Sequence, residues 1–343
     1  MVLNKLGKLR LFFQKYSRRE FRPGYVFDVP QYLYRLYICV KAKSFVFFSN
    51  VNPWMFLSWF AGYGKHAELD KFDRELSPKT ILIFPKENFW KMTKKIKNVW
   101  INYPFIVKPD FGRTGRDVKK IHNEKELRNY YNKINENFVI QEFLHHPLEF
   151  GVFYYRIPGE KRWHITGIVE KRFMFLRGDG KSTFEKLILH HSRAKYYYSK
   201  LQQEYYNLRD SVLADGEEFQ LNYIGNHCRW STFYDKSNLI NEQLERVFDR
   251  ISKKIGWFYF GRYDIKVKSL EDLYKWNIKI IELNGMWSLP VHIYDPDHGL
   301  WFAYKELFRH WEIAYKISRK NLERWIPYMS VREVQKVLRK YGV

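Results

Sequence analysis

Apolar residues recur along the chain with two spacings that alternate. A period of two rich in β-branched and aromatic residues predicts strands, and a spacing of three to four predicts helices. Strands and helices are therefore expected to alternate along much of the chain. The strands are predicted at 80–84, 105–108, 138–142, 150–157, 165–173, 261–267 and 279–284. The helices are predicted at 3–15, 29–42, 86–97, 124–133, 242–255, 306–321 and 330–340, with another starting near residue 182.

In the first fifteen residues, Lys and Arg are interspersed among Leu and Phe. This pattern lacks the uninterrupted apolar core of a secretory signal and predicts a short basic amphipathic helix. Such a helix either docks its apolar face on the protein or lies on an anionic membrane surface.

Residues 44–61 have the length of a marginal membrane span, but Asn50, Asn52 and Pro53 lie in the middle. Two buried amides and a broken helix argue against spanning. We expect a buried strand at 45–48, then a turn and a second apolar segment. A peripheral membrane contact stays open through Trp54, Phe56, Leu57 and Trp59.

Composition narrows the classes of partner. Sixty Lys and Arg against 37 Asp and Glu give a net charge of +23, yet 45% of residues are apolar, which indicates a folded basic protein. Nucleic acid, an anionic membrane, a nucleotide or a plain solvated surface would each suit this charge. No nucleic-acid recognition module is visible in the sequence, so we do not expect nucleic acid to be a partner. Only two cysteines, Cys39 and Cys228, favour a reducing, cytoplasmic compartment, with contact to the inner face of the membrane left open.

The strand pair 261–267 and 279–284 carries the strongest chemical signal. Arg262 and Asp264 share one face of the first strand, and Glu282 and Asn284 share one face of the second. If the two faces coincide, their oxygens form a hard-ligand site suited to Mg²⁺. The alternative is a solvent-facing strand pair with cross-strand charge contacts.

A lysine and a glycine-bearing loop precede this pair along the chain. Lys108 ends a predicted strand, and the loop that follows contains Gly112, Arg113, Thr114 and Gly115. A loop of this kind brings backbone N–H groups close to phosphate oxygens, while the lysine supplies a point charge.

The order of these pieces resembles the ATP-grasp superfamily, in particular enzymes similar to D-alanine–D-alanine ligase. The resemblance covers roughly residues 75–305: the strand lysine with its glycine loop, the acidic segment 141–151, Val169-Glu-Lys171, the turn 178–180, then Arg-x-Asp and Glu-x-Asn. It implies ATP held between two α+β lobes, with Mg²⁺ or alternatively Mn²⁺. It also implies that a substrate carboxylate is activated as an acyl phosphate and joined to an amine, or to a thiol, with release of ADP and phosphate.

The resemblance implies a role for each matching residue. Lys108 and Lys171 would contact phosphates, the loop Gly112 to Arg116 would close over the triphosphate, and Arg262 would stabilise charge on the transferring phosphoryl group. The adenine and ribose would be contacted by Gln141, Glu142, Phe143, Leu144 and Glu149. The metal would be held by Asp264, Glu282 and Asn284. Substrate contacts are expected from Ser288, His227 and His292, although a structural role is the alternative for the two histidines.

Four segments are expected: a basic, aromatic N-terminal lobe at 1–100, a lid lobe at 101–165, a lobe with the metal site at 166–305, and C-terminal helices at 306–343. Met286 and Trp287 stand where D-alanine ligases have a Ser-rich turn, so we expect an acceptor pocket of different shape. Two other functions stay open, a small-molecule kinase of the same fold and a non-enzymatic basic adaptor that binds anionic membrane or nucleic acid. The sequence leaves the oligomeric state undetermined.

Overall fold

The computed structural model describes residues 11, 13–15, 21, 24–59, 64–111, 115–223, 225 and 230–341. The strands are β1 (Thr80–Ile83), β2 (Phe105–Pro109), β3 (Lys119–Ile121), β4 (Phe138–Glu142), β5 (Leu148–Arg156), β6 (Trp163–Arg172), β7 (Phe175–Arg177), β8 (Glu218–Gln220), β9 (Thr232–Asp235), β10 (Phe260–Val267) and β11 (Lys279–Asn284). The α-helices are α2 (Gly24–Ala42), α3 (Lys65–Leu69), α4 (Phe89–Asn98), α5 (Glu124–Tyr131), α6 (Phe184–His190), α7 (Tyr198–Glu204), α8 (Glu242–Ile255), α9 (Leu270–Tyr274), α10 (Leu300–Glu323) and α11 (Val331–Tyr341).

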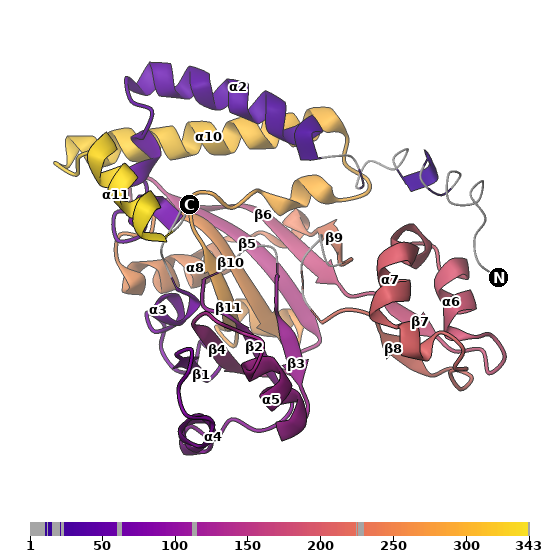
Figure 1. Ribbon diagram of the computed structural model, residues 1–343. Helices are drawn as coiled ribbons and strands as arrows, with labels where there is room; N and C mark the ends of the chain where they lie inside the picture. Colours follow the sequence, from indigo (N-terminus) through magenta and orange to yellow (C-terminus); the bar gives the residue numbers. More distant parts are fainter. Residues whose placement is uncertain are drawn as a thin grey trace.

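The α+β architecture is confirmed. One antiparallel sheet has the strand order β1-β4-β2-β3, a second has the order β11-β10-β5-β6-β9, and β7 pairs with β8. Figure 1 shows α2 and α10 lying together above the five-stranded sheet, the four-stranded sheet with α4 and α5 below it, and a small lobe of α6, α7, β7 and β8 to one side. No helix among the described residues is both long enough and apolar enough to cross a membrane.

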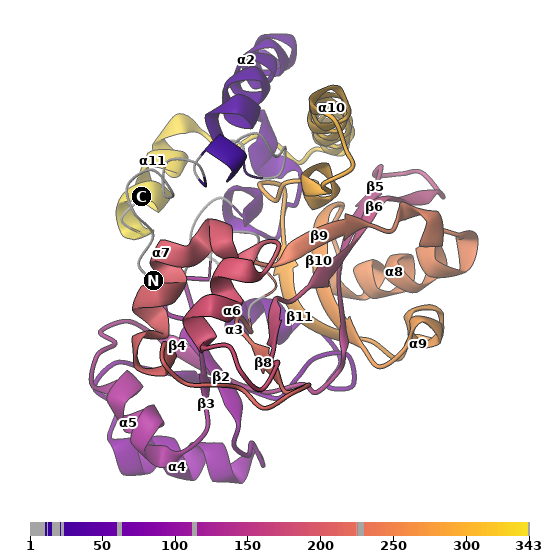
Figure 2. The same ribbon diagram turned by 90° about the vertical axis from the view of Figure 1, so that its right-hand side faces the viewer.

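The two faces of the five-stranded sheet differ in character. Tyr263 and Ile265 of β10 pack on one face against α8 and α9, in a core that also holds Phe248 of α8. Figure 2 shows these two helices on one side of the sheet. On the other face Phe153 and Phe260 pack under α10 at one end of the strands. The alternation of side chains along β10 therefore leaves Arg262 and Asp264 on the face that α8 does not cover.

Helix α2 is held against α10 although Pro30 interrupts its hydrogen bonds. Proline has no N–H to offer the carbonyl four residues earlier, which belongs to Val26. That carbonyl accepts a hydrogen bond from the Tyr304 hydroxyl of α10 instead, at 2.9 Å. The rings of Tyr34 and Phe308 stack beside it, 4.2 Å between centroids.

The prediction of a strand at 45–48 is wrong, because residues 47–50 form a 3₁₀ turn, η2 (Phe47–Asn50). Side chains of α10 satisfy its carbonyls: the Ser318 hydroxyl donates to Phe47 O and the Asn321 amide donates to Asn50 O, both at 2.7 Å. The segment thus packs on a helix without pairing as a strand.

Two of the four residues named for an open membrane contact can be placed. Leu57 is fully buried, and Trp54 is half-buried against the core beneath α8. Leu57 is therefore not exposed to a lipid surface. The side chains of Phe56 and Trp59 lie outside the described part of the chain, as does most of the helix predicted at 3–15.

The sheets do not follow the expected segment boundaries. Strand β1 precedes residue 100 yet pairs with β4, and β6 runs through residue 165. The small lobe has a core of its own around Leu176, Phe184 and Leu201, inside the segment expected to form one lobe.

Candidate functional site

The charged faces of β10 and β11 coincide, as the strand periodicity predicts. Asp264 stands opposite Glu282, and Arg262 stands opposite Asn284. On its other side β10 pairs with β5, which brings Gly151 opposite Asp264. Residues in register on neighbouring strands point to the same face of a sheet. A patch of polar side chains therefore occupies the centre of the sheet.

Asp264 is the centre of this patch and is only 3% exposed. Its Oδ1 lies 2.9 Å from Arg262 Nε, and its Oδ2 lies 3.0 Å from Lys171 Nζ and accepts a hydrogen bond from the Asn284 amide at 3.3 Å. Burial by itself raises the pKa of this carboxyl, but the charges of Arg262 and Lys171 outweigh it and hold the pKa below its ordinary value. Asp264 is therefore ionised, between two cations.

The ion pairs continue along the sheet toward β5. Lys171 Nζ also lies 3.3 Å from Glu149 Oε1, and the second oxygen of that buried carboxylate lies 3.7 Å from Lys266 Nζ. Charges of alternating sign compensate one another, which is the condition for burying them. Lys266 was not predicted as a site residue, although the period of two placed it on the same face as Asp264.

Lys108 reaches this patch from the four-stranded sheet. Its Nζ lies 3.2 Å from Gln141 Oε1 and 3.3 Å from the carbonyl oxygen of Ile281 in β11. The pairing of β10 with β11 shifts at this point and leaves Ile281 as the extra residue of a bulge, so its carbonyl is available. Burial lowers the pKa of Lys108 to about 8, and the nearby Glu282 carboxylate opposes this effect. The two sheets are thus joined at one lysine.

Glu282 is the carboxylate of this patch whose oxygens are least occupied. It is half-buried, and within the described ranges it accepts no hydrogen bond and forms no ion pair at contact distance. The same part of the chain has no group of three or more His, Cys, Asp or Glu residues suited to a metal. Two carboxylates and the Asn284 amide oxygen nevertheless fit Mg²⁺, which takes few protein oxygens and completes its shell with phosphate oxygens and water.

Of residues 141–144, which were predicted to line the adenine site, Gln141 is the one with a hydrogen bond to the charged patch. Gln141 bonds Lys108 and the Thr80 hydroxyl, and Glu142 accepts from the backbone N–H of Lys79 at 3.2 Å. Phe143 lies under the Lys120 ammonium, 4.0 Å from its ring centre. The Leu144 side chain is buried.

Several predicted residues of the loop and the substrate site cannot be placed. Gly112, Arg113, Thr114 and His227 lie outside the described residues, and Gly115 is the first described residue after the loop. Before the loop, buried Asp110 accepts the backbone N–H of His66 at 3.0 Å. The end of β2 is thereby fixed to the start of α3.

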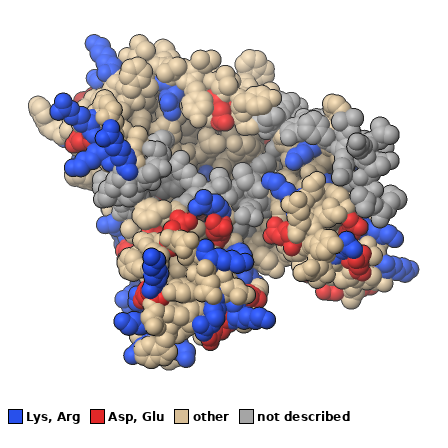
Figure 3. Space-filling view, viewed as in Figure 1, with Lys and Arg blue, Asp and Glu red and all other residues tan. Residues whose placement is uncertain are grey.

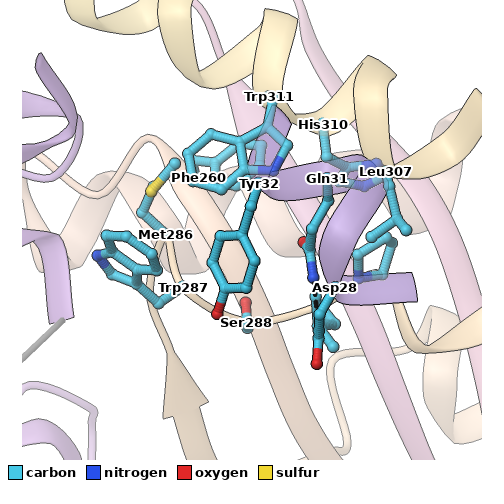
Figure 4. A pocket seen from close by; sticks show the side chains of 12 residues that line it. Asp28, Gln31, Tyr32, Phe260, Met286, Trp287, Ser288, Leu307, His310 and Trp311 are labelled. Carbon is cyan, nitrogen blue, oxygen red and sulfur yellow. Dashed lines mark hydrogen bonds between the residues drawn. The ribbon is translucent and has the colours of Figure 1, made fainter. Parts of the chain in front are cut away.

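A cavity of about 200 Å³ adjoins the patch beneath α2 and α10 (Figure 4). Arg262 Nη1 donates to the carbonyl oxygen of Leu289, a residue that lines the cavity, at 3.1 Å. Ser288 also lines it, with its hydroxyl bonded to Gly285 O at 2.6 Å. The other walls are largely aromatic and come from Tyr32 of α2, Phe260 of β10, Met286 and Trp287 after β11, and Trp311 of α10.

His292 belongs to a different cluster. It lies on η8 (Val291–Tyr294), is buried, and its Nε2 is 3.3 Å from the Glu306 carboxylate of α10. Glu306 also lies 3.3 Å from Arg309. His292 is thus paired with α10 and does not line the cavity.

Two glycines that the sequence reasoning passed over allow the charged side chains to lie close together. A Cβ on Gly151 would lie 3.2 Å from Arg262 Cδ and 3.3 Å from Asp264 Oδ1, and a Cβ on Gly225 would lie 1.8 Å from Glu149 Oε1. A glycine inside a strand pattern, as at Gly151, is a known sign of close approach by another group.

Comparison of the sequence with family models and with curated proteins gives no match. The fold is similar to the D-Ala:D-Ser ligase VanG from Enterococcus faecalis (13% identity, TM-score 0.42), a D-alanine–D-alanine ligase from Bacillus anthracis complexed with ATP (15%, 0.40) and a bifunctional glutathione synthetase from Pasteurella multocida (15%, 0.36). These likenesses cover 74%, 75% and 72% of this chain, and 61%, 68% and 36% of those chains. The chain thus spans about three fifths of VanG and about a third of the glutathione synthetase.

Proposed function

We propose that this chain is an ATP- and Mg²⁺-dependent ligase that activates a carboxylate as an acyl phosphate and joins it to an amine. One observation carries the proposal: Lys108, Lys171 and Arg262 surround strand carboxylates at the point where the two sheets meet. Such a site needs no side-chain nucleophile, because its chemistry is positioning and charge neutralisation.

The balance of charge supports a phosphate ligand. Four cations, Lys108, Lys171, Arg262 and Lys266, adjoin three carboxylates, those of Glu149, Asp264 and Glu282. A triphosphate that carries one Mg²⁺ remains negative, and the one cation in excess of the carboxylates can take up part of that charge. In a site shielded from water each such contact is stronger than at the surface.

Each residue has a task in this proposal. Lys108 binds phosphate oxygens, and with a pKa of about 8 it is largely protonated at neutral pH. Asp264, Glu282 and Asn284 would hold Mg²⁺, which neutralises charge on the phosphates when it is bound. Arg262, fixed by Asp264 and by Leu289 O, lies between these ligands and the cavity, where it can stabilise charge on the group being transferred.

The reaction balances in two steps. A substrate carboxylate oxygen attacks the γ-phosphorus, the bond to the ADP oxygen breaks, and an acyl phosphate forms. The amine nitrogen then attacks the acyl carbon, phosphate leaves, and the nitrogen loses a proton. We infer that the cavity receives one of the two substrates, since the Arg262 guanidinium is bonded to Leu289 O in its wall.

Thermal unfolding with ATP and Mg²⁺ tests nucleotide binding. Ligand at about a hundredfold over its dissociation constant adds roughly 2.7 kcal/mol to the free energy of unfolding. We expect this gain in the wild type and in Lys119→Ala, an exposed lysine of β3, and its loss in Lys108→Ala and Glu282→Gln, each compared with its own ligand-free midpoint. If anionic lipid or nucleic acid stabilises the protein and ATP–Mg²⁺ does not, the chain is a basic adaptor.

A second assay separates a ligase from a kinase. Carboxylates are screened with ATP, Mg²⁺ and hydroxylamine, which traps an acyl phosphate as a hydroxamate. Hydroxamate formed together with ADP supports the ligase. A stable phosphorylated product with no hydroxamate would assign a kinase instead.

A further inference from the structure

Helix α2 is apolar on its outward face as well as on its inward face. The outward side chains are 47% to 74% exposed, and they recur every three or four residues as one row: Tyr25, Val29, Tyr32, Leu33, Leu36, Tyr37 and Val40. We call this row the α2 stripe. On the inward face Phe27, Ile38 and Cys39 are buried. A helix that is apolar on all sides is normally buried on all sides. The outward face of α2 is therefore unusually exposed for its composition.

The stripe is large for a protein surface. A helix of 19 residues is roughly 28 Å long, and the row extends over most of it. Figure 3 shows few charged side chains along the edge of the molecule formed by α2, whereas Lys and Arg crowd the lobe of α4 and α5. Contiguous apolar surface of this extent marks an interaction site.

The described residues that precede α2 do not cover the stripe. Lys15 Nζ lies 5.0 Å from the ring centre of Tyr197, and the Phe21 ring lies 5.4 Å from the rings of Tyr196 and Tyr197. Both residues thus pack on the small lobe of α6 and α7. Within the described part of the chain the stripe is thus left exposed.

The charge beside the stripe indicates which partner. Helix α10 packs along α2, and its exposed side is basic, with Lys305, Arg309, Lys316, Arg319 and Lys320 at helical spacing. Of the acids on this side, Glu312 is bonded to Lys41 and to the Tyr34 hydroxyl, both at 3.0 Å. Glu323, at the end of the row, is paired with Lys320. An apolar row rich in tyrosine next to a row of Lys and Arg is the composition of a helix that lies in a membrane interface.

A second copy of the chain fits this face less well. Pairing two stripes about a two-fold axis would bring two basic α10 rows toward each other, and like charges oppose that contact. An anionic bilayer takes up the apolar row and the basic row together.

We propose that the α2 stripe docks on the surface of an anionic phospholipid membrane, with α2 in the plane of the interface and the basic row of α10 against the headgroups. The contact is peripheral. It goes beyond the ligase proposal, because the stripe and row side chains lie outside the charged patch. Tyr32 of the stripe also lines the cavity, whereas Leu33 and Leu36 do not.

Co-sedimentation of the full chain with vesicles tests the proposal. We expect the wild type to sediment with vesicles of equal parts phosphatidylcholine and phosphatidylglycerol, and to stay in the supernatant with phosphatidylcholine alone. Leu33→Glu with Leu36→Glu should lower the bound fraction by about tenfold. Trp90→Glu with Trp100→Glu, two exposed tryptophans of the four-stranded lobe, is the matched control and should bind as the wild type does.

A second variant tests the electrostatic part. Arg309→Gln with Lys316→Gln keeps the stripe intact and should weaken binding to the anionic vesicles while reducing its dependence on salt. Unchanged melting midpoints will show that both double variants are folded. The proposal is overturned if the wild type does not bind anionic vesicles, or if the stripe variant binds as well as the wild type. It is equally overturned if sedimentation velocity shows a wild-type dimer that the stripe variant converts to monomer without any vesicle binding.

Discussion

Lys108 is buried between two sheets, and its protonation should govern nucleotide binding. Its pKa of about 8 is below the ordinary value for lysine because of burial. A phosphate favours the charged ammonium, so raising the pH through about 8 removes the favourable form. We expect the affinity for ATP to fall by roughly tenfold between about pH 7 and pH 9.5, measured by calorimetry. The phosphate itself is fully ionised above about pH 7, since its second pKa is near 6.

Arginine at this position provides the control. Lys108→Arg keeps a charge that does not titrate in this range, and its ATP affinity should stay level with pH. A wild-type affinity that is equally level would mean that Lys108 does not contact the phosphates.

The two strand carboxylates should respond differently to neutralisation. Asp264→Asn leaves Arg262 and Lys171 buried without their shared anion, so we expect the free energy of unfolding to fall by about 3 kcal/mol. Glu282→Gln removes no contact-distance ion pair, and its stability should stay within about 1 kcal/mol of the wild type. Chemical denaturation without ligand measures both. Equal losses for the two variants would refute the distinction, and Glu271→Gln, exposed on α9, controls for the change in net charge.

At the scale of single residues, the sequence predicted which metal-site side chains share a strand face. It did not predict the contacts that other residues make with them. A period of two is enough to place Arg262 with Asp264 and Glu282 with Asn284, because antiparallel pairing then has only two faces to choose from. The bulge at Ile281, which frees a carbonyl for Lys108, depends on a local shift in register that no periodicity contains. The approach of Gly225 to Glu149 depends on tertiary packing in the same way.

Among the elements, the turn that follows η2 anchors β10. Buried Asn52 accepts the backbone N–H groups of Tyr259 and Phe260, at 2.9 and 3.1 Å, and donates to Phe260 O at 2.7 Å. Asn52→Ala leaves these groups buried without partners, so we expect a loss of about 3 kcal/mol in the free energy of unfolding. Exposed Asn98→Ala should change it by less than about 0.5 kcal/mol. A loss for Asn52→Ala as small as that of the control would show that water replaces the amide.

Long periodic elements were predictable, and short elements fixed by packing were not. The strands at 138–142 and 279–284 and the helix at 242–255 have the predicted bounds, because each presents a continuous apolar face. Strands β7 and β8 have three residues each, too few for a period to be detected, so the small lobe was not predicted. The 3₁₀ turn η2 was read as a strand because its apolar run is compatible with either structure.

In the whole molecule, the contact between Lys108 and Ile281 is where a bound nucleotide would join the two sheets. ATP with Mg²⁺ bound at this point should protect backbone amides in β2 and in β11 together, as measured by hydrogen exchange. Lys108→Ala should restrict the protection to the five-stranded sheet, because the remaining cations and metal ligands all lie there. Strands β7 and β8 of the small lobe serve as the internal reference for unspecific stabilisation. Protection confined to one sheet in the wild type would mean that the nucleotide binds one lobe only, and the function would then have to be assigned to that lobe alone.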